Sequence, residues 1–377
     1  MRICIVFDCL YPYTIGGAER WYRNLSERLA ASGHQVTYLT LRQWPRDEHP
    51  DVPGVEVVAV APRLELYTSG RRSLRAQTAF AAGVLRHLIT RREYDAVHTA
   101  ALHLSALATM APRRLRRYRL AVDWFEVWTR AYWREYVGPV FGPAAWAGQL
   151  LSLKTPQHGF CFSRLHEERL RELGFRHELT RLGGLYSGPT TPAQPREPEP
   201  LIVFAGRQIP EKAVTALVPA LQEARKQLPQ LRAEIYGDGP EHQRLLEAIA
   251  AAGLGDAVEA PGFVSEERVE DAFRRSLCHV LPSRREGYGL VVIDAAAQAT
   301  PSVVVRAPDN AAVELIEEDV NGVVAASASA TDLAAAIGRV HAAGFDLRRS
   351  TAGWFERNAP RLSIESSLEA VLAGYGS

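Results

Sequence analysis

The residues with the clearest chemical pattern follow a predicted buried strand at His279–Leu281. A turn reading Glu-Gly-Tyr-Gly occupies residues 286–289 and leads into a predicted helix over Gly289–Ala299. Amide groups at a helix N-terminus bind phosphate, and glycines let a ligand approach the backbone. Glu286 and Asp294 are eight residues apart, about two helical turns, so both carboxylates can accept hydrogen bonds from one hydroxyl-rich ligand. The alternative is an ordinary strand–turn–helix corner with two exposed acids.

A second charged segment follows the predicted strand at Leu201–Ala205. Arg207 comes directly after Gly206, and Lys212 follows Arg207 five positions later. Arginine can bind phosphate oxygens through paired hydrogen bonds and lysine adds a point charge, so the pair suits a diphosphate. Taken alone, the segment favours two solvated surface cations.

A pair of glycines, Gly16 and Gly17, lies between the first predicted strand, Arg2–Asp8, and a predicted helix over Ala18–Ser32. Two residues without Cβ before a helix allow a phosphate or sugar to reach the backbone amides, although a plain tight turn explains them equally well. The sequence contains neither the G-x-G-x-x-G dinucleotide pattern nor a P-loop, which argues against a dinucleotide-dependent oxidoreductase.

Strand and helix patterns alternate on both sides of a segment with five prolines between Ser187 and Pro200. This alternation predicts parallel sheets with crossover helices, and the prolines predict a stiff connection. We therefore predict an α/β chain with two Rossmann-like parallel-sheet domains facing each other across a cleft. The predicted boundaries are 1–187 for the first domain, 188–200 for the linker and 201–353 for the second domain.

The composition is that of a globular protein, with 47% hydrophobic and 23% charged residues. The chain has no apolar run of about 18 residues and only four scattered cysteines, which predicts a cytoplasmic protein without a metal-ligand cluster. Residues 1–187 contain 26 Lys/Arg and 17 Asp/Glu, a balance of +9. This basic half suits an acidic acceptor or an anionic membrane surface, and an unevenly charged soluble surface is the equal alternative.

Two further segments of the basic half have two interpretations each. The arginine-rich stretch Arg113–Arg119 can contact anionic lipid, although a solvated helix end is the favoured interpretation. The stretch Asp123–Tyr136 is dense in aromatic and acidic residues, so it can form a ring-stacking acceptor wall. A partly buried helix with aromatic packing explains it equally well.

Six short motifs follow one another along the chain in an order that resembles the retaining GT-B glycosyltransferases of family 4. They extend over about residues 1–325, and their order is specific to the fold and the donor class but not to the sugar. The motifs are Gly16–Arg20, Gly206-Arg207 with Lys212, Tyr236–Pro240, Gly262–Val264, Glu286–Leu290 and Asn321-Gly322.

The resemblance implies a nucleotide-sugar donor in the second domain, an acceptor in the first, and a C-terminal helix, residues 354–377, that crosses back to the first domain. It implies that Glu286 lies beside the transferred sugar and that Arg207 and Lys212 neutralise the diphosphate. Asp294 would hold ribose hydroxyls, and the backbone near Val264 would meet the base. The predicted donor-binding residues are Gly16, Gly17, Val264, Gly287, Tyr288, Gly289, Leu290 and Asp294.

The sequence departs from the family pattern at three places. The second acid of the usual Glu–Glu pair is Asp294, and Asp309-Asn310 replaces the usual Gly-Gly before the late acid. His98 matches the first histidine of a His-x-His motif, whereas an alanine replaces the second. We predict His98 as a catalytic residue, and His103 and Asp123 are further candidates for assisting the reaction.

The resemblance implies a metal-independent, cofactor-free enzyme that moves a hexosyl or pentosyl group from a nucleoside-diphosphate sugar to a hydroxyl with retention of configuration. The acceptor would be a small molecule, a glycan or a lipid-linked molecule, with peripheral membrane contact as an option and no role for nucleic acid. Two other classes stay open, namely an epimerase or phosphorylase on the same fold and a non-catalytic nucleotide-sugar binding protein.

Overall fold

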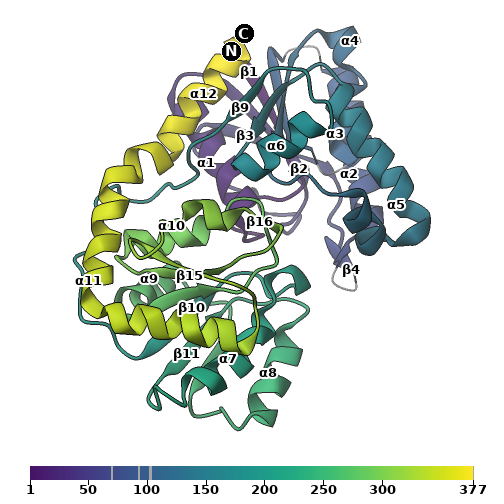
Figure 1. The fold of residues 1–377 in the computed structure, drawn as a ribbon. Coiled ribbons are helices and arrows are strands. Elements are labelled where there is room, and N and C mark those ends of the chain that lie inside the picture. Colours follow the sequence, from purple (N-terminus) through teal and green to yellow (C-terminus); the bar gives the residue numbers. More distant parts are fainter. Residues whose placement is uncertain (69–70, 92–93, 102–103, 377) are drawn as a thin grey trace. The chain divides into compact units, whose positions relative to one another are not determined.

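A computed structural model describes residues 1–68, 71–91, 94–101 and 104–376 (Figure 1). The chain forms two compact units. Unit 1 consists of Met1–Leu185 together with Ile364–Ser377, and unit 2 consists of Tyr186–Ser363. Each unit has its own parallel sheet and its own hydrophobic core, so each is built as a separate α/β domain.

The sheet of unit 1 has the strand order β3-β2-β1-β6-β7-β8-β9 in the described residues, and every neighbouring pair is parallel. Its central strands are buried on both faces, which explains the continuous apolar sequence of β1, whereas β6 includes the buried polar residues His98 and Thr99. The order reverses direction between β1 and β6, and this point is where open parallel sheets bind ligands. The strands are β1 (Arg2–Val6), β2 (Gln35–Leu41), β3 (Val55–Ala61), β6 (Ala96–Ala100), β7 (Arg119–Trp124), β8 (His158–Cys161) and β9 (Leu179–Arg181).

Helices cover the sheet of unit 1, and a short antiparallel ribbon, β4 (Tyr67–Thr68) with β5 (Arg71–Arg72), precedes the second of them. The last helix of the chain lies against α1, β7 and β8, so the C-terminus completes unit 1 (Figure 1). The helices are α1 (Gly17–Ala31), α2 (Leu74–Thr90), α3 (Leu104–Met110), α4 (Arg113–Arg116), α5 (Arg130–Lys154), α6 (Arg164–Glu172) and α12 (Ile364–Gly376).

The sheet of unit 2 repeats the doubly wound pattern with the order β12-β11-β10-β13-β15-β17, again with parallel pairs. Its reversal lies between β10 and β13. A separate parallel pair, β14 (Arg285–Glu286) with β16 (Asp309–Asn310), lies beyond the end of β13. The main strands are β10 (Leu201–Ala205), β11 (Arg232–Tyr236), β12 (Val258–Gly262), β13 (Cys278–Leu281), β15 (Ser302–Val305) and β17 (Gly322–Ala325).

Two helices of unit 2 begin at serine residues whose side chains accept a hydrogen bond from the first helical turn, namely Ser265 before α9 and Ser329 before α11. Ser265 accepts a hydrogen bond from the Arg268 amide at the start of α9, whose first turn is acidic and whose last turn is basic, which complements the helix dipole. The helices are α7 (Leu217–Ala224), α8 (His242–Ala251), α9 (Glu266–Arg275), α10 (Leu290–Ala297) and α11 (Ala330–Leu362), with 3-10 turns at Pro210–Lys212, Val214–Ala216 and Ala311–Leu315.

The proline-rich segment and the end of α11 both belong to unit 2. The amide of Ala193 donates to the carbonyl of Ala297 at 2.7 Å, so the proline-rich segment runs along this unit. Trp354 and Phe355 are buried in the core of unit 2. The chain therefore passes to unit 1 between Ser363 and Ile364, later than the predicted division at residue 354, because those two aromatic rings anchor the end of α11.

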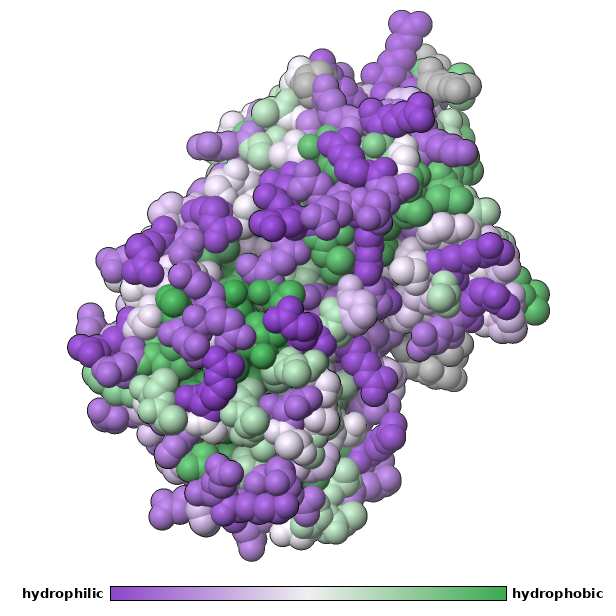
Figure 2. All heavy atoms as spheres, in the orientation of Figure 1, coloured by the Kyte–Doolittle hydropathy of each residue, from purple (hydrophilic) through white to green (hydrophobic). Residues whose placement is uncertain are grey.

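In the part of the chain that the structure describes, no helix combines the length and the apolar character needed to cross a bilayer. The surface in Figure 2 is mostly hydrophilic with scattered apolar side chains.

Candidate functional site

Most of the predicted chemistry lies at the carboxyl ends of β10 and β13 in unit 2. Arg207 and Lys212 follow β10, and Glu286 follows β13. These two strands are neighbours, and they flank the reversal of the strand order. The sequence motifs that were far apart along the chain are therefore brought to the position where doubly wound sheets bind ligands.

Glu286 and Lys212 are in direct contact. The Lys212 ammonium donates a hydrogen bond to Oε1 of Glu286, and the Ser283 hydroxyl donates to the same oxygen at 2.7 Å. The side chain of Glu286 is 8% exposed and that of Lys212 is 18% exposed. Two donors thus stabilise a nearly buried carboxylate. An ammonium group has three N–H donors, so Lys212 can bind Glu286 and still offer hydrogen bonds to an anion.

The segment that carries Glu286 is held by the strand pair β14–β16. Arg285 and Asp309 form an ion pair across this pair, with 2.6 Å between Nη2 and Oδ2. Arg285 is 6% exposed, so the ion pair is largely shielded from solvent. Asp309, which departs from the family pattern, therefore helps to hold β14 and β16 together in this chain.

Asn310 connects three backbone segments beside Glu286. Its amide nitrogen donates to the carbonyls of Ser283 at 3.1 Å and Val305 at 2.7 Å, and its oxygen accepts from the amide of Ala312 at 3.0 Å. A buried amide side chain with all these partners fixes the backbone around the Ser283 hydroxyl. Neither Asn310 nor Ser283 was predicted from the sequence. The replacement of the family's two glycines by Asp309-Asn310 was a signal that could have pointed to Asn310.

The turn from Gly287 to Leu290 positions the start of α10. Gly289 precedes the helix with φ of +98°, and a Cβ at this position would lie 2.6 Å from the Cβ of Ala312. Gly287, Tyr288 and Leu290 are half-buried around it. The first amides of a helix lack intrahelical partners, so the N-terminus of α10 is suited to a phosphate.

Asp294 and Val264 mark the outer parts of the predicted donor site. Asp294 lies on α10, one turn after Leu290, and its side chain is half-buried. Val264 follows β12 and packs against a small cluster that includes Tyr236 and Phe273. The structure thus brings Lys212 and Glu286 into contact and places Asp294 on the adjoining helix, whereas Val264 belongs to a strand end further along the sheet.

The loop that carries Arg207 is fixed by close backbone contacts. A Cβ at Gly237, where φ is +109°, would lie 2.0 Å from the carbonyl oxygen of Gly206. Gln208 is buried; its side-chain nitrogen donates to the carbonyl of Gly237 at 2.7 Å, and its side-chain oxygen pairs with Nδ1 of His242 at 2.9 Å. These contacts hold the half-buried Arg207 in place, and sequence reasoning missed Gln208.

In unit 1, His98 lies inside the protein. Its Nε2 contacts Oδ1 of Asp123 at 2.8 Å, and its Nδ1 contacts the hydroxyl of Tyr375 at 2.6 Å. The indole of Trp21 donates to the other oxygen of Asp123 at 2.8 Å. His98 and Asp123 have no exposed surface. This arrangement favours a positioning role, in which His98 links β6 and β7 to α12; His103, the neighbouring candidate, lies outside the described residues.

The glycine pair of unit 1 opens α1, as its sequence suggested. Gly17 is the first helical residue, and Gly16 precedes it. A Cβ at Gly16 would lie 2.3 Å from a carboxylate oxygen of Glu19, which is 3% exposed. The chain thus places its own carboxylate against the first turn of α1, where the helix dipole favours a negative charge.

Solved structures with the same fold cover the whole chain. Sucrose-phosphate synthase from Thermosynechococcus elongatus matches 100% of this chain and 98% of its own, with a TM-score of 0.80 and 18% identity. The Anabaena protein Alr3699/HepE, solved in complex with UDP-glucose, matches 99% of both chains, with a TM-score of 0.73 and 16% identity. The fold is that of two Rossmann-like parallel-sheet domains of the GT-B type.

Two family models match the sequence, one in each unit. The Glycosyl transferase 4-like domain matches residues 16–182, and Glycosyl transferases group 1 matches residues 191–351. The chain belongs to the GT-B glycosyltransferases. The resemblance inferred from the six motifs is confirmed at this level.

The curated relatives of this glycosyltransferase are matched over part of their length. The alpha-D-kanosaminyltransferase of Streptomyces kanamyceticus is 32% identical over 142 residues, which is 37% of this chain and 36% of that protein. Two other relatives are matched over 28% and 14% of their length. The chain thus spans about a third or less of these relatives, and their substrates do not define those of this glycosyltransferase.

Proposed function

We propose that this glycosyltransferase moves a sugar from a nucleoside-diphosphate sugar bound by unit 2 to a hydroxyl of an acceptor bound by unit 1, with retention of configuration and without a metal ion. The observation that carries the proposal is the contact of Lys212 with Glu286 beside Ser283, at the reversal of the strand order in unit 2. It joins a cation suited to phosphate and a carboxylate suited to sugar hydroxyls in one cluster.

The donor diphosphate is assigned to the cations after β10 and to the N-terminus of α10. As the glycosidic bond breaks, negative charge grows on the departing diphosphate. Arg207, Lys212 and the amides after Gly289 stabilise that charge. These groups supply the positive charge that a metal ion supplies in other transferases, and among the described residues no cluster of His, Cys, Asp and Glu suits a metal.

Retention follows from attack on the same face that the diphosphate leaves. The acceptor oxygen forms the new bond to the anomeric carbon while the bond to the phosphate oxygen breaks. The departing phosphate oxygen takes the acceptor's proton, so no protein base is required. Glu286 acts beside the sugar as a hydrogen-bond acceptor for hydroxyls and as the partner that positions Lys212.

The acceptor is assigned to an aromatic cluster of unit 1 at the start of α5. The ring of Trp128 lies 4.7 Å from that of Tyr132 and 4.9 Å from that of Tyr136. The hydroxyl of Tyr136 accepts a hydrogen bond from the amide of Arg72 at 3.3 Å, and the guanidinium of Arg72 binds Asp8 at 2.8 Å, at the end of β1. The half-buried aromatic rings are thus linked through Arg72 to the end of β1. Such rings suit an acceptor that contains sugar or other rings.

The nature of the donor is tested by calorimetry with UDP, GDP, TDP and ADP in the presence of a chelator. One nucleotide should bind the wild type, bind Arg207→Ala at least ten-fold more weakly, and bind the control Arg244→Ala as it binds the wild type. Arg244 is an exposed arginine of α8. Absence of binding to all four nucleotides, or binding only when the chelator is omitted, would contradict the proposal.

Stereochemistry and catalysis are tested with the nucleotide identified in this way. Proton NMR of the product from the corresponding α-linked nucleotide sugar should show an α-glycoside. A β-glycoside would rule out retention. Donor binding without transfer to any acceptor would favour a binding protein, and release of nucleotide without an acceptor would favour an epimerase or phosphorylase.

A further inference from the structure

One end of unit 1 carries arginines that the proposed reaction does not use. We name it the basic end and define it as Arg113, Arg116, Arg117, Arg119 and Arg176. The first four lie on or beside α4, and Arg176 lies in the loop before β9. The sequence from residue 96 to residue 122 contains no Asp or Glu, so the region around α4 has no acidic residue of its own.

Four of the five arginines of the basic end form no ion pair with the residues that the structure describes. Among the described residues, Arg113, Arg116, Arg117 and Arg176 have no carboxylate oxygen within 4.0 Å. The Nε atoms of Arg113 and Arg116 are buried without a hydrogen-bond partner in the same set of residues. Arg117, Arg119 and Arg176 are exposed. This end of unit 1 therefore attracts anions.

A large apolar side chain projects from the middle of these cations. Leu115 is 79% exposed and lies on α4 between Arg113 and Arg116. An exposed leucine surrounded by arginines has no packing function within unit 1. Such a combination suits the boundary between charged headgroups and acyl chains, where apolar and cationic side chains are both stabilised.

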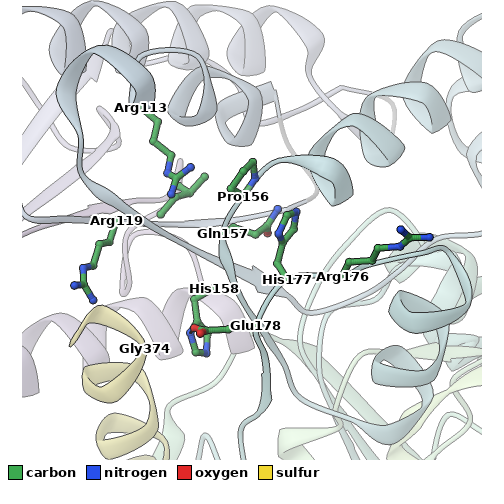
Figure 3. Close-up of a pocket in the computed structure, with 10 residues that line it drawn as sticks. Arg113, Arg119, Pro156, Gln157, His158, Arg176, His177, Glu178 and Gly374 are labelled. Atoms are coloured by element: carbon green, nitrogen blue, oxygen red, sulfur yellow. The ribbon is translucent and has the colours of Figure 1, made fainter. Parts of the chain in front are cut away.

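A hollow of about 390 Å³ adjoins α4 (Figure 3). Arg113, Arg119, Arg176, His158 and His177 line it, and its acidic residue, Glu178, is hydrogen-bonded to His158 at 3.0 Å. Figure 3 shows that Arg119 and Arg176 extend to opposite sides of the hollow. The guanidinium groups are thus spread over a surface and do not converge on one point, which suits several headgroups better than one small anion.

The basic end lies at the edge of the sheet where the amino ends of the strands meet, opposite to the edge formed by their carboxyl ends. Arg119 opens β7 and His158 opens β8, so the hollow is at the amino ends of these strands. In Figure 1, α4 lies at the end of unit 1 that also carries both chain termini. Ligands of the fold bind at the carboxyl ends of the strands, so contacts at the basic end leave the acceptor site of unit 1 uncovered.

We propose that the basic end binds the surface of an anionic phospholipid bilayer, with the arginines contacting the headgroup phosphates and Leu115 entering the acyl boundary. Each arginine near such a surface strengthens binding roughly five-fold, so three of them account for about a hundred-fold at low ionic strength. Salt weakens this attraction because the Debye length is about 8 Å at physiological ionic strength.

The test is co-sedimentation of the whole chain with vesicles of phosphatidylcholine, with and without one third phosphatidylglycerol. The charge variant is Arg117→Gln, Arg119→Gln, Arg176→Gln, and the apolar variant is Leu115→Gln. A matched control changes three exposed arginines elsewhere, namely Arg46→Gln, Arg244→Gln and Arg349→Gln. Far-UV circular dichroism and thermal melting show whether each variant is folded. If the charge variant unfolds, binding of the Leu115→Gln variant still tests the proposal.

The wild type and the control should bind only the anionic vesicles, and binding should fall with added salt. The charge variant should bind about a hundred-fold more weakly, and Leu115→Gln several-fold more weakly. Equal binding of charge variant and control would overturn the proposal, as would binding to neutral vesicles. Soluble inorganic polyphosphate is the second probe: equally tight binding that is insensitive to Leu115→Gln would instead indicate a site for soluble polyanions. Nucleotide binding is measured separately, so failure of this proposal does not affect the donor proposal.

Discussion

Lys212 and Glu286 are 74 positions apart in the sequence, and the Lys212 ammonium donates a hydrogen bond to the Glu286 carboxylate. The contact joins the loop after β10 to the segment after β13. Because both side chains are largely buried, each depends on the other for its charge compensation. Loss of either one leaves the other charge poorly solvated, so substitutions here should affect binding and catalysis together.

The first prediction concerns the charge of Lys212. Replacement by Met removes a cation from the proposed diphosphate site, and kcat/KM should fall by about 100- to 1000-fold, as for loss of a group that stabilises transition-state charge. Nucleotide affinity should fall as well. The matched control is Lys226→Met, which changes an exposed lysine paired with Glu223. A Lys212→Met enzyme with the activity of the control would show that this lysine does not act on the donor.

The second prediction concerns Ser283, which positions Glu286 through the 2.7 Å hydrogen bond. Ser283→Ala removes a hydrogen bond to a charged group, a loss of about 1.5–3 kcal/mol, so kcat/KM should fall by roughly 10- to 100-fold. Nucleotide affinity should stay near that of the wild type, since Lys212 still binds Glu286. Kinetics and calorimetry on the same preparation separate the two effects. A fall in nucleotide affinity as large as the fall in kcat/KM would contradict this positioning role.

The strands of unit 2 show what the sequence makes predictable. The expected strand Leu201–Ala205 is confirmed at these bounds as β10. A parallel strand that is covered on both faces produces an uninterrupted apolar run, and the alternation with helices determines the doubly wound fold. Lys212 and Glu286 were also named from their positions after strand ends.

Contacts between distant segments were not predictable in the same way. Asn310 was seen only as a departure from a family pattern, because its backbone partner Ser283 is 27 positions away in the sequence. Asp123 was included in the stretch Asp123–Tyr136, which was interpreted either as an acceptor wall or as a partly buried helix. It is instead the fifth residue of β7, where its buried carboxylate contacts both His98 and Trp21. Local periodicity does not report which buried polar groups become partners.

The third prediction concerns the turn before α10. Gly289→Ala places a Cβ 2.6 Å from that of Ala312 at a left-handed backbone position, so unit 2 should lose roughly 1–3 kcal/mol of stability and nucleotide binding should weaken. Gly338→Ala is the control. Gly338 lies inside α11, a Cβ there meets no atom within 4 Å, and this variant should be slightly stabilised, by up to about 1 kcal/mol. Thermal melting with and without nucleotide measures both variants, and unchanged melting of Gly289→Ala would disprove the expected strain.

The fourth prediction separates a positioning role of His98 from a catalytic one. Tyr375→Phe removes the hydroxyl that pairs with His98 Nδ1, which should cost unit 1 about 1–3 kcal/mol because a buried ring nitrogen loses its partner. His98→Ala should cost more, and the two losses should be non-additive in a double-mutant cycle. Activity per folded molecule should fall less than ten-fold in Tyr375→Phe. A loss of activity above 1000-fold in a fully stable His98→Ala would instead indicate catalysis.

The fifth prediction is a pH dependence that originates at His279. This histidine of β13 is completely buried, and its Nδ1 contacts the Ser302 hydroxyl at 3.0 Å, while Nε2 has no partner among the described residues. Burial, with a smaller contribution from the charge of Lys212, lowers the pKa of His279 from 6.5 to about 3. Below pH 6.5, His279 therefore binds a proton in the unfolded chain but stays neutral in the folded protein until the pH approaches 3.

The sign of the effect follows from proton binding. Above pH 6.5 the imidazole of His279 is neutral in both the folded and the unfolded state, so its protonation does not affect the unfolding free energy. Between pH 6.5 and 3 the unfolded chain binds more protons, so the unfolding free energy of unit 2 should decrease by up to about 1.4 kcal/mol per pH unit as the pH falls. Urea unfolding between pH 7 and 4.5 should show this slope reduced in His279→Asn. His341→Asn, at an exposed position of α11, should keep the wild-type slope. Equal slopes in all three proteins would mean that His279 does not carry the pH dependence.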